Sequence, residues 1–229
     1  MADIPRLNGA IKALESGKPA FVPFSPGEIS SALTISSAPY DGVVFEMEHN
    51  PYDIKALRDC LQYMLNRRQI ATSGSIAPAV TPFVRIPPNG GENSQWIAKQ
   101  VLDIGVYGIV WPLAPDGEIL VVVMCEEARA IDNLPDILRS VPGISVVLIG
   151  EGDLSQDLGY PRQYEHPTVA SAINEVLAIC KQYNVPCGHP HVDAKNVESL
   201  LEQGFRWLMP GPVPSFAALE IGRRVAGRA

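Results

Sequence analysis

Two kinds of hydrophobic pattern alternate along the chain. Short, uninterrupted apolar runs are typical of strands buried on both faces, and the segments between them repeat apolar residues every three to four positions, as one side of a helix does. Eight runs predict strands, at 20–24, 41–47, 81–86, 108–111, 119–125, 145–149, 185–188 and 205–209. Strands that alternate with helices indicate parallel β-α-β units.

The predicted helices begin and end at residues with a known preference for helix termini. A leading helix covers 6–16, and a later one is interrupted at Pro135. A helix that starts after Asp53 is expected to end in Arg67 and Arg68, whose charge suits the negative end of the helix dipole. The other expected starts are Asn93 or Ser94, Pro167, Asp193 and Ser215, and the expected stops are Gly17, Gly105 and Gly204.

This order of elements predicts a TIM-type (β/α)8 barrel that forms a single domain over residues 1–229. A doubly wound nucleotide-binding sheet is the alternative, but no GxGxxG and no GxxxxGK[ST] pattern follows a predicted strand. Only six residues, 113–118, separate Trp111-Pro112 from the strand that begins at 119. Parallel strands normally need a connection of a dozen or more residues. We therefore expect a barrel that lacks the helix between its fourth and fifth strands.

A missing helix has a predicted consequence for assembly. It should uncover apolar side chains on the outer faces of the strands beside it, among them Ile109, Val121 and Val123. Monomeric proteins seldom leave a large apolar patch exposed to water. We therefore expect a homo-oligomer in which a neighbouring subunit covers this face.

Composition narrows the classes of partner. The formal net charge is −7, and no Lys/Arg stripe is present that would neutralise a phosphate backbone, which argues against nucleic acid and favours small molecules. The first 18 residues carry five charged side chains and no later apolar stretch reaches the length of a membrane span, so we expect a cytoplasmic protein without a membrane partner. The four cysteines show no CxxC spacing and are expected to be buried, reduced thiols.

Charged and titratable residues stand at the ends of several predicted strands, namely Glu46, Arg85, Glu126, Asp153, His189 and His191. An ionised carboxylate at the end of a buried strand is costly to desolvate unless it is paired, hydrogen-bonded or bound to a cation. In a barrel the carboxyl ends of all strands meet at one end, where functional groups gather. The pattern therefore predicts one shared site.

Each of these residues also has a purely structural interpretation. Glu48 and His49 could form an ion pair in a loop, and Arg85 could do no more than pair with a carboxylate at a strand end. Glu126 could belong to the acidic first turn of a helix, and Asp153 could cap the helix that follows it. A structural or supporting role is favoured for the two histidines. The shared site is preferred for the others because the structural interpretation has to be repeated at every strand.

Taken in order, these motifs resemble the HpcH/HpaI aldolase family, whose members are metal-dependent pyruvate aldolases grouped with citrate lyase β-type enzymes. The resemblance covers nearly the whole chain. It is carried by EMEHNPYD at 46–53, FVRIP at 83–87, MCE at 124–126 with Asn133-Leu134 after it, GEGDLS at 150–155 and Leu158-Gly159.

The resemblance implies a role for each site residue. Glu126 and Asp153 would be the protein ligands of a divalent cation, Mg²⁺, Mn²⁺ or Co²⁺. Arg85 and the backbone amides of Gly152 and Asp153 would hold the carboxylate of pyruvate. His49, with Glu46 behind it, would match a His-acid dyad that moves protons through water, although Glu46 is one methylene longer than the aspartate common in the family.

The implied activity is that of a class II aldolase, an aldehyde-lyase that cleaves or forms hydroxy-2-oxo acids through a pyruvate enolate. Two carboxylates leave positions on a hard cation that a 2-oxo acid can fill with its keto and carboxylate oxygens. A Schiff-base route is disfavoured because all six lysines fall on predicted helices or loops. Two alternatives remain: a citrate-lyase-β-like acyl-CoA lyase, which needs a basic groove for CoA, and a catalytically silent barrel with a binding or structural role.

Overall fold

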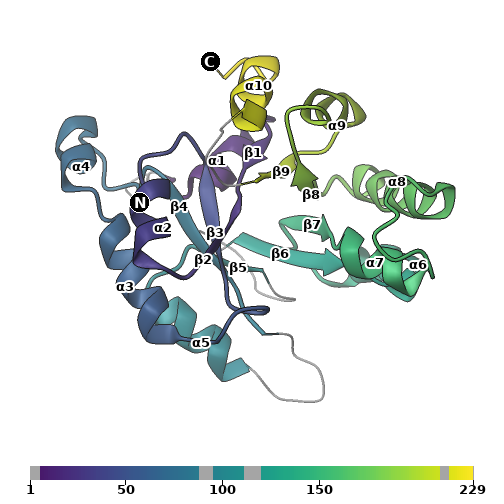
Figure 1. Cartoon of the computed structure of the whole chain (residues 1–229), viewed down its shortest axis with the longest axis horizontal. Coiled ribbons are helices and arrows are strands. Elements are labelled where there is room, and N and C mark those ends of the chain that lie inside the picture. Colours follow the sequence, from purple (N-terminus) through teal and green to yellow (C-terminus); the bar gives the residue numbers. More distant parts are fainter. Residues whose placement is uncertain (1–5, 88–94, 111–119, 212–216, 229) are drawn as a thin grey trace.

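The computed structural model describes residues 6–87, 95–110, 120–211 and 217–228, which form one parallel sheet and the helices around it (Figure 1). The strands are β1 (Ala20–Phe21), β2 (Phe24–Pro26), β3 (Gly42–Glu46), β4 (Thr81–Arg85), β5 (Gly108–Val110), β6 (Leu120–Cys125), β7 (Val146–Ile149), β8 (Cys187–Val192) and β9 (Trp207–Pro210). The helices are α1 (Gly9–Glu15), α2 (Ile29–Ile35), α3 (Ile54–Met64), α4 (Arg67–Ser73), α5 (Gln95–Asp103), α6 (Ala128–Ser140), α7 (Glu151–Asp157), α8 (Pro167–Gln182), α9 (Val197–Gln203) and α10 (Ala217–Val225).

The two ends of the sheet are pieces of one continuous segment. The strand order is β1-β9-β8-β7-β6-β5-β4-β3-β2, with every neighbouring pair parallel. Between β1 and β2, the Val22 N–H donates to the Leu208 carbonyl at 2.9 Å and the Pro23 carbonyl accepts from Val44 N–H at 2.9 Å. Segment 20–26 therefore pairs with β9 through its first half and with β3 through its second. The α/β class is confirmed, and this curled sheet is consistent with a TIM-type barrel.

Large aromatic side chains fill the interior of the sheet. The rings of Phe83 and Trp207, both essentially buried, meet edge to face with centroids 5.7 Å apart. Glycines stand opposite them: a Cβ atom at Gly108 would lie 2.7 Å from the Phe83 ring and 2.6 Å from the Leu120 carbonyl oxygen. Interiors of small barrels are filled by such pairing of large and small residues.

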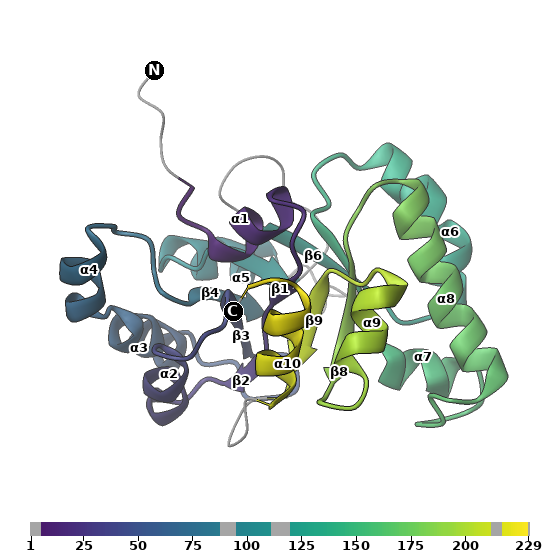
Figure 2. The ribbon, with the colours of Figure 1, turned by 90° about the horizontal axis from the view of Figure 1, so that it is seen from above.

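Most of the helices surround the strands on the outside (Figure 2), whereas Ala10 and Ala13 of α1 pack in the same cluster as Phe83 and Trp207. A second apolar cluster lies between the sheet and these helices, and it includes Phe45 of β3, Leu57 of α3 and Val176 of α8. Ile109, Val121 and Val123 belong to the same cluster, together with residues of α5 and α6, and are only 7%, 3% and 9% exposed. The prediction that these three side chains are uncovered is therefore wrong, because the flanking helices contribute to the layer that buries them.

The connection between β5 and β6 falls outside the described residues. Gly108 pairs with Leu120 in register, so the two strands are direct parallel neighbours with residues 111–119 between them. The sequence predicts that this interval lacks the usual helix, and the absence of that helix stays a prediction. The expected helix starts at Asn93 or Ser94 and at Ser215 also lie outside the described part of the chain.

Several predicted helix termini are confirmed. The carboxylate of Asp53 accepts hydrogen bonds from the Lys55 and Ala56 amides at 2.9 Å, and Pro167 opens α8. The predicted stops Gly17, Gly105 and Gly204 adopt φ values of 74°, 101° and 106°. Such positive φ angles favour glycine because it lacks a Cβ atom.

Three predicted helix features are wrong. Arg67 and Arg68 begin α4 instead of ending the previous helix, because the Asn66 side chain accepts from the Gln69 amide at 3.0 Å and caps a new start. Pro135 lies inside α6 without interrupting it, because the buried Ile131 and Leu134 on either side of this turn anchor the helix to the core and offset the cost of the proline. Asn196 is the N-cap of α9, because the Asp193 carboxylate, which accepts from the Lys195 and Asn196 amides at 2.7 and 3.0 Å, caps the turn that precedes the helix.

One strand and one helix differ more. The seventh predicted strand was placed at 185–188, but β8 continues to Val192, with a register irregularity against β9 between His189 and Val192. The two histidines therefore lie within a strand, where cross-strand pairing overrides the low strand preference of the intervening proline. Helix α2 was not predicted at all, because only two of its residues, Ala32 and Ile35, are buried and the apolar period is short.

The cysteine prediction is confirmed, since all four thiols are free and buried. Each helix in the described ranges falls short of the length and apolar character that a bilayer span requires.

The interior packing gives a test of the fold. We expect Gly108→Ala to lower the free energy of unfolding by about 1–3 kcal/mol, the usual cost of overpacking a core, because the new methyl group meets a backbone carbonyl that cannot rotate away. Urea unfolding measures this, with Gly27→Ala as the control, since no atom lies within 4 Å of a Cβ at that position. Equal stabilities of the two variants would contradict this account of the interior.

Candidate active site at the carboxyl ends of the strands

Parallel pairing brings the predicted site residues to one end of the sheet. Glu46, the last residue of β3, pairs in register with Arg85, the last residue of β4. Cys125 and Ile149 pair in the same way at the ends of β6 and β7, so Glu126 and Gly150 follow them side by side. The sequence prediction of one shared end is therefore confirmed for these strands.

Two carboxylates surround the guanidinium group of Arg85, whose side chain is 11% exposed. Its Nε donates to Glu46 Oε2 at 2.7 Å, its Nη2 donates to the same oxygen, and its Nε lies 3.1 Å from Glu48 Oε2. The ring of Phe24 packs 4.5 Å from the guanidinium carbon, and Nη1 donates to the sulfur of Met124 at 3.6 Å. The two carboxylates thus balance the positive charge of Arg85, which offsets the free-energy cost of taking the guanidinium group out of water.

Glu46 contacts His49 through the backbone. Its Oε1 accepts from the amides of Glu48 and His49 at 2.7 and 3.2 Å, while its Oε2 is bonded to Arg85. The His49 side chain is 65% exposed, and its Nε2 lies 3.9 Å from Glu48 Oε2. The structure therefore brings Glu46 and His49 together but does not form a bond between their side chains.

Sequence reasoning missed the role of Glu48 as a partner of Arg85. Glu48 follows the end of β3 at Glu46, so strand alternation gives no signal for this contact. The predicted pairing of Glu48 with His49 in the loop is also present, at 3.9 Å, beside the shorter contact with Arg85.

The predicted metal ligands lie close enough to influence each other. Burial raises the pKa of the half-buried Glu126, and the negative charges of Asp153 and then Glu48 raise it further. A Cβ atom at Gly150 would lie 2.6 Å from the Glu126 Cβ and 2.7 Å from its Oε2, so only glycine leaves room for this carboxylate. Asp153 is exposed in the first turn of α7.

This donor set suits a hard divalent cation. Two carboxylates that repel each other would both be stabilised by a positive ion between them, and oxygen is the ligand that Mg²⁺ and Mn²⁺ prefer. Within the described ranges, no group of three or more His, Cys, Asp or Glu side chains is arranged to hold a metal. A cation bound by Glu126 and Asp153 would therefore keep positions for water or substrate oxygens.

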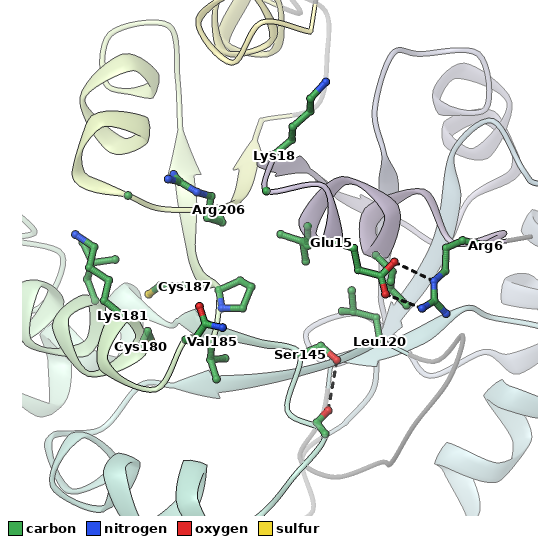
Figure 3. A pocket seen from close by; sticks show the side chains of 18 residues that line it. Arg6, Glu15, Lys18, Leu120, Ser145, Cys180, Lys181, Val185, Cys187 and Arg206 are labelled. Atoms are coloured by element: carbon green, nitrogen blue, oxygen red, sulfur yellow. Dashed lines mark hydrogen bonds and ion pairs between the residues drawn. The ribbon is translucent and has the colours of Figure 1, made fainter.

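A basic cavity of about 700 Å³ lies at the other end of the strands (Figure 3). Its lining includes Leu120 and Cys187, the first residues of β6 and β8. The Lys181 ammonium donates to the Gln203 carbonyl at 2.5 Å and the Arg206 guanidinium to the Phe205 carbonyl at 3.0 Å, so these cations bind the chain's own backbone. This cavity is therefore not a basic groove beside the carboxylates.

Comparison with known proteins relates the chain to one family. Residues 113–211 match the HpcH/HpaI aldolase/citrate lyase family. A hydroxypyruvate/pyruvate aldolase from Roseobacter denitrificans is 25% identical over 88% of this chain and 90% of its own length. The crystal structure of an HpcH/HpaI aldolase/citrate lyase family protein from Burkholderia cenocepacia superposes with a TM-score of 0.75 at 22% identity, covering 96% of this chain and 98% of that one. The citrate lyase β subunit from Mycobacterium tuberculosis superposes with a TM-score of 0.67 at 16% identity, covering 93% and 98%.

The coupling between the two carboxylates is measurable. We expect Asp153→Asn to lower the pKa of Glu126, because it removes the larger of the neighbouring negative charges while burial is unchanged. Side-chain carboxyl ¹³C NMR of the metal-free protein over a pH series measures this. Glu127→Gln is the matched control, since the charge of Glu127 raises the same pKa less. A larger shift in the control would contradict the assigned proximity of Asp153.

Proposed function

Because residues 113–211 match the HpcH/HpaI aldolase/citrate lyase family, we propose that the chain is a class II pyruvate aldolase, a carbon–carbon lyase that cleaves or forms hydroxy-2-oxo acids. One observation carries the proposal: Glu126 and Asp153 are coupled electrostatically at the end of the sheet where Arg85 also lies. Carboxylates for a cation and a guanidinium for an anion are what recognition of a 2-oxo acid needs.

Glu126 and Asp153 would hold a divalent cation, Mg²⁺, Mn²⁺ or Co²⁺. Such a cation supplies Lewis-acid stabilisation of the negative charge that develops on the keto oxygen when the carbon–carbon bond breaks. Gly150 leaves space for the Glu126 carboxylate, and the first turn of α7 fixes the backbone of Asp153.

Arg85 would bind the substrate carboxylate. Its Nη1 contacts only a weak acceptor among the described residues, the sulfur of Met124, so this edge of the guanidinium is offered to a stronger one. The amides of Gly152 and Asp153, which lie in the first turn of α7 and have no partner within the helix, would face the same carboxylate.

His49 would take the proton from the hydroxyl group of the cleaved substrate and return it in the reverse reaction, through water. An imidazole exchanges protons near neutral pH, and the ring of His49 is exposed to water. Glu46 would hold His49 in place through its backbone amide. Each of the six lysines lies on a helix or a connecting segment, so none is placed on a strand for a Schiff base.

The proposal extends to organisation. We propose one domain over residues 1–229 that works in the cytoplasm as a homo-oligomer on small 2-oxo acids and aldehydes. The free cysteines support a reducing compartment. Ile29 and Leu33 of α2 and Trp96 of α5, at 40%, 50% and 54% exposure, support a subunit contact on that side.

The metal assignment is tested by removing one ligand charge at a time. Glu126→Gln and Asp153→Asn should each abolish the stimulation of pyruvate release by added Mg²⁺, Mn²⁺ or Co²⁺ on a panel of hydroxy-oxo acids, with a far-UV circular dichroism spectrum close to wild type. Glu127→Gln, next to the site but exposed, should keep the stimulation. Full activity in either ligand variant would remove the metal site from the proposal.

The role of Arg85 is tested by keeping its charge and changing its shape. Arg85→Lys loses the two-pronged geometry that fits a carboxylate. We expect a loss of about 1.5 kcal/mol of substrate binding, or roughly a tenfold rise in KM for the oxo acid. Steady-state kinetics measure it, and an unchanged KM would reduce Arg85 to a structural ion pair with Glu46 and Glu48.

A further inference from the structure

A buried carboxylate that the proposed chemistry does not use lies directly behind the site. Glu151, the first residue of α7, is 2% exposed. Its Oε1 is hydrogen-bonded to Nδ1 of His191, and its Oε2 lies 3.4 Å from Nε2 of His189. Both histidines belong to β8, so one side chain joins the start of α7 to the end of the neighbouring strand.

This cluster lies on the outer side of the sheet, away from the substrate. His189 shares a face of β8 with Cys187, which belongs to the outer apolar cluster, and its ring packs edge to face on Phe205 with centroids 5.2 Å apart. Gly150, by contrast, packs on the Glu126 carboxylate. Gly150 therefore contacts Glu126 directly, whereas the next residue, Glu151, contacts the two histidines on the outer side of the sheet.

The position of the His191 ring is fixed by several partners. Tyr164 stacks on it with centroids 5.3 Å apart, and the Asn196 side chain donates to the His191 carbonyl at 2.8 Å. The hydrogen bond to Glu151 raises the pKa of His191, while burial lowers that of His189. Two imidazoles thus face a carboxylate that would be costly to bury alone.

The other end of α7 is held to the segment that follows Glu126. The Ala128 amide donates to Asp157 Oδ2 at 2.8 Å, two residues beyond Glu126. Helix α7 is thus attached at its first residue to β8 and at its last residue to the start of α6. Asp153 lies between these two attachments, in the same turn as Glu151.

We infer that Glu151, His189 and His191 form a clamp that positions Asp153 and the Gly152 amide relative to Glu126. The inference rests on the proposed function, because it assigns these three as positioning residues for the cation site and not as groups that touch substrate. Outer residues that orient metal ligands typically contribute 10–100-fold to metal affinity. The clamp should therefore affect cation binding more than global stability.

His191 offers the sharpest test because its side chain is 57% exposed and its removal leaves the core intact. His191→Ala removes the donor to Glu151, whereas His191→Asn places an amide N–H where the imidazole Nδ1 stood. We expect His191→Ala to weaken Mn²⁺ binding about tenfold, as measured by electron paramagnetic resonance of the free ion, and to raise KM for the oxo acid. His191→Asn should restore most of the affinity.

A matched control removes charge from the same region without touching the clamp. Glu165, exposed and lining the same outer cavity as Glu151, His189 and His191, is changed in Glu165→Gln, which should bind Mn²⁺ as wild type does. Hydrogen exchange of the Leu154 amide, which donates to the Gly150 carbonyl and so reports on the start of α7, should speed up without metal in His191→Ala alone, and urea unfolding should move little.

The outcomes separate the two proposals. Wild-type protein that binds Mn²⁺, with His191→Ala unchanged in affinity and in exchange, would overturn the clamp and leave the proposed function standing. Wild-type protein that binds no Mn²⁺ and releases no pyruvate would overturn the proposed function and with it the role assigned to the clamp. Equal losses in His191→Ala, His191→Asn and Glu165→Gln would also overturn the clamp.

Discussion

The pairing of one short segment with both edges of the sheet is the constraint on which the site depends. Segment 20–26 hydrogen-bonds to β9 through its first half and to β3 through its second half, and so joins the two ends of the sheet. Its position is secured from the far end of the chain: the Asp41 carboxylate accepts from the Phe21 amide at 2.9 Å and from the Arg228 guanidinium at 2.8 Å. The same segment supplies Phe24 beneath Arg85. The segment that joins the two ends of the sheet therefore also supplies part of the site.

Charge at the carboxyl ends is divided into a satisfied and an unsatisfied half. Glu46 and Glu48 neutralise Arg85 at the ends of β3 and β4. Glu126 has no such partner among the described residues, and its pKa is raised first by burial and then by the negative charge of Asp153. Two carboxylates around one guanidinium leave the first half with a net negative charge, and the second half adds two more carboxylates, so the electrostatics of the whole site favour a cation. That division follows from which strand ends carry an arginine.

Sequence patterns predicted what is local or periodic. The Asp53 cap, the proline start of α8 and the buried runs of β3, β4, β6 and β7 depend on neighbouring residues, and the structure has them within one or two positions. What failed depends on partners distant in the chain. β8 extends through His191 because β9 pairs with it, and Ile109 is buried because helices on either side share its layer. The Glu46 contact with Arg85 likewise needs the register of two strands, which no single segment contains.

Gly150 has no functional group, yet the site depends on it because it leaves space for the Glu126 carboxylate. Any other side chain there would occupy the space of the Glu126 carboxylate, so a substitution of Gly150 would displace that carboxylate. A lineage could lose its chemistry by a change that alters no charge, no hydrogen bond and no predicted helix. A sequence comparison that checks only the acidic, basic and histidine positions would still find every one of these residues in such a protein.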